Sequence, residues 1–317
     1  MGFGFRTLVG IGLTLFSGLA LAQGPAKTVA ERLGYPANAR LLMLHADDFG
    51  VAHSQNRATM EALEHRWVTS ASIMVPCPWF PEVAAWAKQH PEADLGIHLT
   101  LNAEWRPYRW RGASPQPKDS GLLDPDGFLP LTSQEVVQRA KPKEVETEAR
   151  AQVDQALAAG IHLTHVDTHM LTVVFSPELL RVYLETGRRY HLPVLLEKRG
   201  MAPVNGLMSF YDSKIPVDSV PFDGVLGISP GVETSGWLDA YKKLLAPQGP
   251  GVYMLMLHLA YDDEEMRGIT AGQKDWGSKW RQNDFDMVRS AEFQAFLKEQ
   301  GFILVGWRDL LKAMPAP

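Results

Sequence analysis

Short apolar runs alternate with amphipathic stretches along the chain from residue 23 onward. The apolar runs are mostly continuous rather than alternating, which is typical of parallel strands that are covered on both faces. They predict strands at residues 41–46, 70–75, 95–101, 163–168, 193–197, 252–260 and 302–305.

The amphipathic stretches predict helices at residues 54–67, 81–90, 142–159, 177–190, 237–245 and 284–300. Ser54 is the expected cap of the first helix, and the next three helices begin on proline. Strands that alternate with helices pair in parallel, with the helices as crossovers. The chain is therefore of the α/β class, and the pattern fits a closed barrel or an open doubly wound sheet.

Two stretches interrupt this alternation, residues 102–131 and residues 199–236, and both are rich in Gly and Pro. Loops of this length in a compact domain usually cover a site. We expect both to be long functional loops or insertions rather than linkers.

The first residues have the features of an export signal. Arg6 precedes an apolar run over residues 8–21, and Ala-Leu-Ala stands before Gln23. This predicts a signal peptide at residues 1–22 and a periplasmic or extracellular location. A permanent membrane anchor is the alternative, but the run is shorter than the roughly 20 apolar residues of a spanning helix and contains three glycines. We therefore expect no stable membrane insertion.

Composition excludes some classes of function. Hydrophobic residues make up 45% of the chain and charged residues 21%, as in an ordinary globular protein with a sizeable core. The net charge of −5 points away from nucleic acid, whose partners normally carry a basic excess. Cys77 is the only cysteine, so an intrachain disulfide is excluded. Length and composition alone do not decide between one large domain and two small ones.

Polar residues stand at the carboxyl ends of several predicted strands, where parallel α/β folds place their active sites. Taken alone, a pair of aspartates is more often a turn or a cap, and a strand histidine is more often a core residue. Taken together, four polar strand ends are hard to explain as independent structural features. The residues concerned are His45, Asp47, Asp48, His98, His165, Asp167, His169 and His258.

Asp and His together form the ligand set of a hydrolytic metal centre, with carboxylate oxygen, imidazole nitrogen and an open position for water. Asp47 and Asp48 cannot point the same way from an extended strand, because successive side chains alternate. The chain can turn at the strand end, so that one aspartate binds the metal while the other accepts a proton.

The order of these segments resembles the YdjC or ChbG-like carbohydrate deacetylase family. The matching segments are HADDFG at 45–50, TSASIMV at 69–75, LGIHLTL at 95–101, HVDTH at 165–169 and MLMLH at 254–258. The resemblance covers the chain from about residue 40 to its end. It implies a distorted (β/α) TIM-like barrel of parallel strands with outer helices, a single domain over residues 23–317, and one divalent metal ion, Mg²⁺ or Zn²⁺.

The resemblance also implies roles for individual residues. Asp48, His98 and His169 would bind the metal, Asp47 would be the general base, and His258 the general acid. His165 would then support a ligand from behind or contact the substrate. Arg199, just beyond a predicted strand, is a further candidate for substrate contact.

The sequence departs from the family's usual pattern in three places. His45 stands where the family often has Asn, and Met170 to Thr172 stand where it often has a further His. Leu259 and Ala260 follow the late histidine, where Pro-Gly is common. These changes leave the implied metal ligands intact but affect the surroundings of His258.

The implied activity is metal-dependent hydrolysis of acetyl groups from N-acetylated sugars such as chitooligosaccharides, so the partner would be a small molecule or an oligosaccharide. The sequence also allows a homodimer. Five aromatic residues are candidates for stacking on sugar rings or for packing the loops: Trp105, Tyr108, Trp110, Trp276 and Trp280. The alternatives are a metal-dependent phosphoesterase, which would normally add basic groups for phosphate, and a non-catalytic carbohydrate-binding relative.

Overall fold

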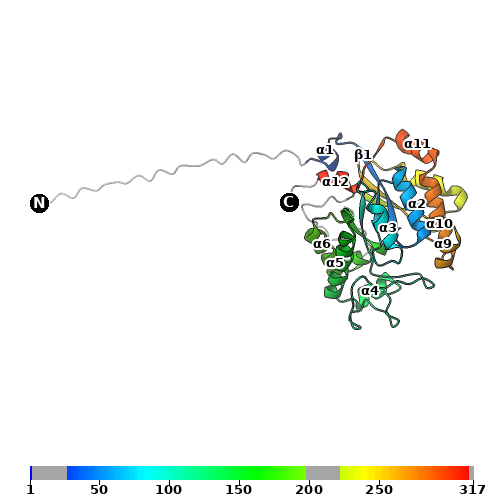
Figure 1. Ribbon diagram of the computed structural model, residues 1–317. Helices are drawn as coiled ribbons and strands as arrows, with labels where there is room; N and C mark the ends of the chain where they lie inside the picture. Colours follow the sequence, from blue (N-terminus) through cyan, green and yellow to red (C-terminus); the bar gives the residue numbers. More distant parts are fainter. Residues whose placement is uncertain (2–26, 198–221, 314–317) are drawn as a thin grey trace.

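The computed structural model describes Met1, residues 27–197 and residues 222–313 (Figure 1). Seven parallel strands form one sheet in the order β4-β3-β2-β1-β6-β5, and β7 pairs with β1 beside this path. The strands are β1 (Arg40–Phe49), β2 (Ser70–Ile73), β3 (Leu95–Leu99), β4 (Leu163–Thr168), β5 (Gly224–Leu226), β6 (Gly251–Leu257) and β7 (Phe302–Leu304).

The sheet is curled into a half-barrel with helices around it (Figure 1). Isolated bridges extend it beyond β4, from Val166 to Val194 and from Glu197 to Phe222. These bridges continue the curled sheet from β4 toward β5. The curled sheet confirms the prediction of a distorted barrel of parallel strands with outer helices, rather than the alternative of an open doubly wound sheet.

Helices cover the outside of the sheet, and two short 3-10 segments precede two of these helices (Figure 1). The helices are α1 (Val29–Arg32), α2 (His53–Glu64), α3 (Phe80–Ala87), α4 (Ser133–Arg139), α5 (Pro142–Ala158), α6 (Pro177–Tyr190), α8 (Trp237–Leu245), α9 (Glu264–Ile269), α10 (Ser278–Val288), α11 (Ala291–Glu299) and α12 (Trp307–Ala313); the 3-10 segments are η1 (His169–Phe175) and η2 (Thr234–Gly236).

Strand β1 lies at the centre of the sheet. One edge pairs with β6 from Arg40 to Ala46, while the other pairs first with β7 and then with β2. Its side chains alternate between two layers. Leu42 and Leu44 pack in the large cluster that includes helix residues, whereas Leu41 and Met43 pack in a second cluster with Trp307. The interior row therefore continues from Met43 to the positions of His45 and Asp47.

Several predicted elements agree with the structure to the residue, namely β4, α6 and α8. The single helix predicted at 284–300 is wrong, because the chain breaks at Arg289 and Ser290, and the Ser290 side chain caps α11. Ser54 is not a cap either. Helix α2 follows Ala52, and the Ser54 hydroxyl donates to Asp263 and Glu265 instead.

The two predicted loops have different outcomes. Residues 102–131 contain no helix or strand, as expected, whereas the described end of the 199–236 stretch includes β5 and η2. Residues 193–197 make bridges but no named strand. The predicted signal peptide, apart from Met1, and Arg199 lie outside the described residues.

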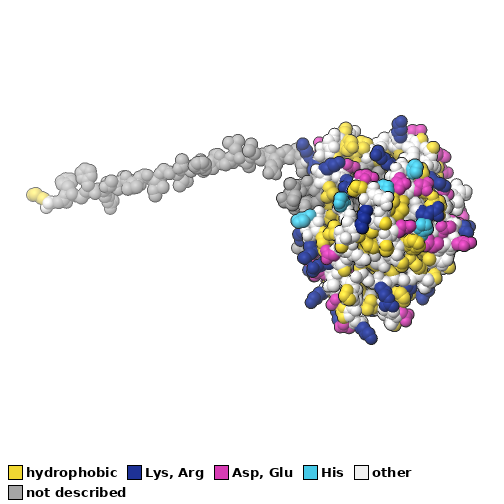
Figure 2. Space-filling model, in the orientation of Figure 1, with side chains coloured by type: hydrophobic (Ala, Val, Ile, Leu, Met, Phe, Trp, Pro, Cys, Tyr) yellow, Lys and Arg dark blue, Asp and Glu magenta, His cyan; other side chains and the backbone are white. Residues whose placement is uncertain are grey.

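The surface seen in Figure 2 carries Lys and Arg side chains interspersed with Asp and Glu. Within the described residues, the structure contains no helix with the length and apolar character needed to span a bilayer.

Candidate active site

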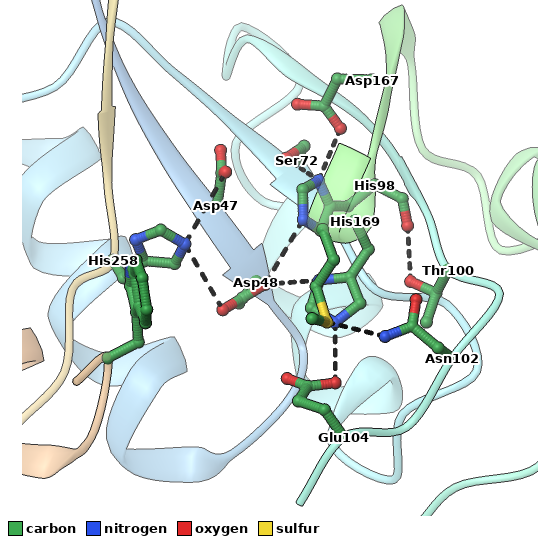
Figure 3. Close-up of polar contacts among 12 residues, drawn as sticks. Asp47, Asp48, Ser72, His98, Thr100, Asn102, Glu104, Asp167, His169 and His258 are labelled. Atoms are coloured by element: carbon green, nitrogen blue, oxygen red, sulfur yellow. Dashed lines mark hydrogen bonds and ion pairs between the residues drawn. The ribbon is translucent and has the colours of Figure 1, made fainter. Parts of the chain in front are cut away.

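The paired aspartates at the end of β1 form the centre of the site (Figure 3). Asp48 has a left-handed backbone, with φ of 64°, which Asp and Asn tolerate better than other non-glycine residues. This turn breaks the alternation of the strand, so that both Asp47 and Asp48 line one pocket. Figure 3 shows His98 and His169 on one side of Asp48 and His258 on the other.

Asp48, His98 and His169 converge on one point. Asp48 Oδ1 lies 3.4 Å from His98 Nε2 and 3.3 Å from His169 Nδ1. One ligand atom from each residue lies within 4.8 Å of the other two, and all three residues are buried. Asp48 Oδ1 has no hydrogen-bond partner among the described residues, so it is free to bind an ion.

Each imidazole of this trio is held from behind by a carboxylate. His98 Nδ1 lies 2.6 Å from Asp167 Oδ1, and His169 Nε2 lies 2.9 Å from Glu104 Oε2. These bonds leave the other nitrogen of each ring facing Asp48. A carboxylate behind an imidazole is the arrangement that orients metal-binding histidines and raises their basicity.

The carboxylates around the imidazoles also favour a positive charge between them. Burial alone would lower the pKa of His98, but Asp167 and Asp47 raise it well above its usual value. Burial is likewise outweighed at His169, where Glu104 and Asp48 raise the pKa to about 9. Protons on the two rings can supply the positive charge, and so can a divalent cation. The donor set therefore fits a metal ion.

Two further groups could hold a metal by proximity, His45 with His165 and Asp167, and Asp47 with His98 and Asp167. Both depend on Asp167, whose oxygens already accept hydrogen bonds from His98 and, at 2.9 Å, from His45 Nε2. In the trio with Asp48, all three residues line the pocket. We therefore take the trio as the candidate metal site.

Arg281 is a component of the site that sequence reasoning missed. Its Nη2 lies 2.7 Å from Asp48 Oδ2, its Nη1 donates to Gln55, and its side chain is 2% exposed. Burial would raise the pKa of Asp48, but the guanidinium and the two imidazoles hold it well below the usual range. Asp48 is therefore ionised. Residues 278–288 contain no signal that distinguishes Arg281 from a surface arginine of a helix.

Asp47 is in a different state from its neighbour. Burial raises its pKa to about 7, and the nearby carboxylates of Asp167 and Asp48 add to the rise, although His98 and His45 oppose it. Its Oδ1 has no hydrogen-bond partner among the described residues and lies 3.5 Å from His45 Nε2. A carboxylate with a pKa near neutrality is suited to accept a proton at physiological pH.

His258 follows directly after β6 and faces both aspartates. Its Nε2 lies 3.9 Å from Asp47 Oδ2 and 4.0 Å from Asp48 Oδ2. Burial keeps its pKa below the usual value, so the free imidazole is neutral. The backbone N–H of His258 donates to Asp284 Oδ2, and Asp284 is itself held by Tyr241 and Trp237. Although Leu259 and Ala260 stand where the family commonly has Pro-Gly, His258 still lies beside both aspartates.

The pocket above these residues has a volume of about 460 Å³. It is lined by Asp47, Asp48, His98, Glu104, Trp105, Thr168, His169, Met170, Leu171, Met256, His258, Gln273, Asp275, Trp276 and Arg281. Five segments far apart in the sequence therefore meet at one cavity.

His165 lies below the pocket, inside the half-barrel. Its ring stacks on Trp307 at 4.6 Å, its Nδ1 contacts Thr164, and its Nε2 lies 4.0 Å from Asp167 Oδ2. It does not line the pocket, so it can act on the site through its neighbours Asp167 and His45. Asp167 and Glu104 were not assigned roles from the sequence. For Asp167 a signal existed, since it stands between His165 and His169 at spacing two.

Comparison with known proteins gives the family. The model of the YdjC-like proteins matches residues 41–299, which include every described site residue. The chain belongs to the YdjC-like family. A carbohydrate deacetylase of Thermus thermophilus is 33% identical to this YdjC-like chain over 90% of it and 98% of the relative. A carbohydrate deacetylase of Halalkalibacterium halodurans is 29% identical over 71% of the chain and 87% of the relative.

A solved structure agrees with the fold of this YdjC-like protein. It is the crystal structure of a candidate cellobiose-phosphate cleavage protein from Enterococcus faecalis V583, with a TM-score of 0.70 and 23% identity. The match covers 86% of the chain and 99% of the solved protein. The predicted family is confirmed, and the names of the curated relatives agree with the predicted enzyme class.

Proposed function

We propose that this protein is a metal-dependent deacetylase that hydrolyses acetyl groups from N-acetylated sugars such as chitooligosaccharides. The observation that carries the proposal is the bare Asp48 Oδ1, which faces His98 Nε2 and His169 Nδ1 at the edge of the pocket. Relatives named carbohydrate deacetylase support the substrate class.

One divalent ion would be held by Asp48, His98 and His169. Such an ion polarises a carbonyl oxygen and makes a nearby water more acidic. The two imidazoles suit Zn²⁺, while the carboxylate with additional waters would serve Mg²⁺. Elemental analysis of the purified protein distinguishes the two ions.

Asp47 would accept a proton from the water that attacks the acetyl carbonyl, because its pKa lies close to neutrality. His258 would then protonate the amine as the C–N bond breaks. Since the free His258 is neutral, it must first gain a proton. Asp47 is the source that the geometry favours, because Asp48 lies at a similar distance but is kept ionised by Arg281. Acetate and the free amino sugar are the products.

The alternative of a phosphoesterase is less well supported. A phosphate site normally supplies arginine or lysine donors. Among the described residues that line the pocket, Arg281 is the one such side chain, and its guanidinium already binds Asp48, Gln55 and the Trp276 carbonyl. A non-catalytic binding protein would have no use for the near-neutral carboxylate of Asp47.

The test is acetate release from N-acetylated chitooligosaccharides, measured beside phosphate release from a generic phosphate ester. We expect acetate and no phosphate. Chelation should abolish acetate release, and returning the metal found by elemental analysis should restore it. Activity that survives complete removal of metal would contradict metal dependence, and phosphate release without acetate would favour the phosphoesterase.

The N-terminal sequence supports a second proposal, that residues 1–22 are removed on export and that residues 23–317 act as one domain in the periplasm or outside the cell. Mass spectrometry of the protein recovered from the exported fraction should give a first residue at Gln23. An uncleaved chain in that fraction would contradict the signal peptide. Size measurement of the same sample decides between a monomer and a homodimer.

A further inference from the structure

The rim of the pocket carries unusual backbone conformations. Six non-glycine residues of the described chain have positive φ, and four of them line the pocket: Asp48, Met170, Leu171 and Trp276, leaving Arg66 and His191 elsewhere. Such conformations cost free energy and persist where the surrounding structure enforces them, often at functional sites. Asp48 is explained by the candidate metal site. The other three are bulky apolar residues and need a separate explanation.

Trp276 differs from the other aromatic residues near the pocket in its exposure. It is 42% exposed, whereas Trp105, Trp110 and Trp280 are between 2% and 5% exposed. The fifth aromatic candidate, Tyr108, is tied down by a hydrogen bond from its hydroxyl to the Val51 carbonyl. Three tryptophans are therefore packing residues, and Trp276 alone among the five presents a large free indole surface beside the site.

The indole of Trp276 is supported from behind. Its ring lies 5.1 Å from the ring of Trp280 at an angle of 31°, and Trp280 in turn packs edge-on against Trp237 at 4.8 Å. A ring backed in this way is held in place while part of its surface stays accessible. Met170, which is 45% exposed, and Leu171 add further apolar surface to the same pocket.

Arg281 connects Trp276 to the candidate metal site. Its Nε donates to the Trp276 carbonyl at 2.8 Å, while its Nη2 binds Asp48 Oδ2 at 2.7 Å. One planar guanidinium therefore links the Trp276 backbone to the candidate metal ligand Asp48. The bond also helps to hold the left-handed Trp276 backbone in place, because the carbonyl accepts from the buried arginine.

We propose that the exposed indole of Trp276 is the surface on which a pyranose ring of the substrate stacks, and that Arg281 fixes the distance of that ring from Asp48. The inference rests on the proposed function and names the binding surface of the same site. A pyranose presents an apolar face of C–H groups, which gains from contact with a large aromatic surface, and its hydroxyls need polar partners. Gln273 and Asp275 line the pocket next to Trp276 and can supply them.

The test compares Trp276→Asn with Trp276→Phe. Asn tolerates a left-handed backbone and keeps the carbonyl that binds Arg281, so the first variant removes the indole without removing this bond. Phe restores an aromatic surface. Trp79→Ala is the control, because Trp79 is also exposed, at 37%, but packs against His53 and does not line the pocket.

We expect Trp276→Asn to raise KM for an N-acetylated chitooligosaccharide about three- to tenfold, as befits the loss of one aromatic contact. Its KM for methyl acetate, an acetyl donor without a ring, should stay within twofold, and its metal content should not change. Trp276→Phe should recover most of the affinity, and Trp79→Ala should match the parent. An unchanged KM for the oligosaccharide, or an equal rise for both substrates, overturns the proposal.

Binding is measured separately from turnover, so that failure of the proposed function and failure of the stacking surface are distinguishable. Intrinsic tryptophan fluorescence is recorded while the N-acetylated chitooligosaccharide is titrated into the parent, Trp276→Asn and Trp79→Ala proteins. We expect saturable quenching in the parent and in Trp79→Ala and its loss in Trp276→Asn. Saturable binding that survives in Trp276→Asn with unchanged affinity, measured by calorimetry, overturns the inference even if the enzyme proves inactive.

Discussion

Two cavities at opposite ends of β3 each contain a buried aspartate, but the hydrogen bonds of the two aspartates differ. The larger cavity, of about 640 Å³, includes Asp94 at the amino end of β3. Both oxygens of Asp94 accept hydrogen bonds, Oδ1 from the Thr164 hydroxyl and Oδ2 from the Arg308 backbone. The smaller cavity contains Asp48, whose Oδ1 accepts none from the described residues.

The difference shows that the hydrogen bonding of the buried carboxylate identifies the site better than the volume of the cavity or the burial of the carboxylate does. A buried carboxylate that is fully hydrogen-bonded is a structural link, as Asp94 is between β3, β4 and the start of α12. A buried carboxylate oxygen without a hydrogen-bond partner costs free energy unless a ligand binds to it. Asp48 and Asp47 both have such an oxygen, and two imidazoles face the one on Asp48.

The largest effect should come from Asp48→Asn. The amide tolerates the left-handed backbone but has no charge to offer a cation, so bound metal should fall close to zero. Acetate release should fall by at least about a thousandfold, because a bound ion contributes several kcal/mol to the reaction. Elemental analysis and an acetate assay measure both, with circular dichroism to confirm folding. A variant that binds stoichiometric metal would remove Asp48 from the ligand set.

The next effect concerns Asp47→Asn. It should retain metal and lose about 10²- to 10⁴-fold in kcat, the usual contribution of a general base. In the parent, kcat/KM should fall as the pH drops through the pKa of Asp47, because protonation removes the base. That pKa is about 7 without metal. A bound cation favours the ionised carboxylate, so it moves the fall in kcat/KM to lower pH. Near-normal turnover in the variant would mean that another group is the base.

A smaller effect is expected for Glu104→Gln. The neutral amide can still bond to His169 Nε2 but no longer raises the basicity of the ring. Metal affinity should fall about 10- to 100-fold, as when a carboxylate behind a ligand histidine is lost. Competition with a coloured chelator measures the affinity. An unchanged affinity would show that Glu104 does not support the metal site.

The comparison is sharpest for Asp94→Asn, which should affect the fold and leave the site unchanged. The amide nitrogen that replaces one carboxylate oxygen cannot accept a hydrogen bond. One of the two buried donors, the Thr164 hydroxyl or the Arg308 backbone N–H, therefore loses its acceptor. The free energy of unfolding should fall by about 1–3 kcal/mol. Chemical denaturation measures this loss, while metal content and kcat should equal those of the parent. A loss of metal in this variant would mean that the two ends of the strands are coupled.

The fold was predictable where the local pattern is strong and isolated. Helix α6 begins on Pro177 after a capping Ser176, and Pro193 follows three residues after its end, so both of its limits are visible in the sequence. Strand β5 was missed because three residues within a Gly-rich stretch are too few to show a pattern of apolar and polar positions. Helices α10 and α11 were merged because Ser290 caps the second helix without interrupting the hydrophobic pattern.

The site was predictable to the extent that its residues end strands. Asp47, Asp48, His98, His169 and His258 were all expected near one another, and the structure brings them together around one pocket. Their catalytic and metal-binding roles stay predictions. Glu104 and Arg281 were not found, because one lies in a loop and the other on a helix. Their contribution depends on tertiary contacts that no local spacing encodes.

The left-handed turn at Asp48 limits how this centre can be altered by mutation. Asn and Gly fit the backbone but offer no anionic oxygen, and a longer or branched side chain would meet both strain and a misplaced donor atom. Glu at this position would therefore be a poor replacement despite its shared chemistry. Attempts to change which ion the protein prefers have more freedom at the carboxylates behind the histidines than at position 48 itself.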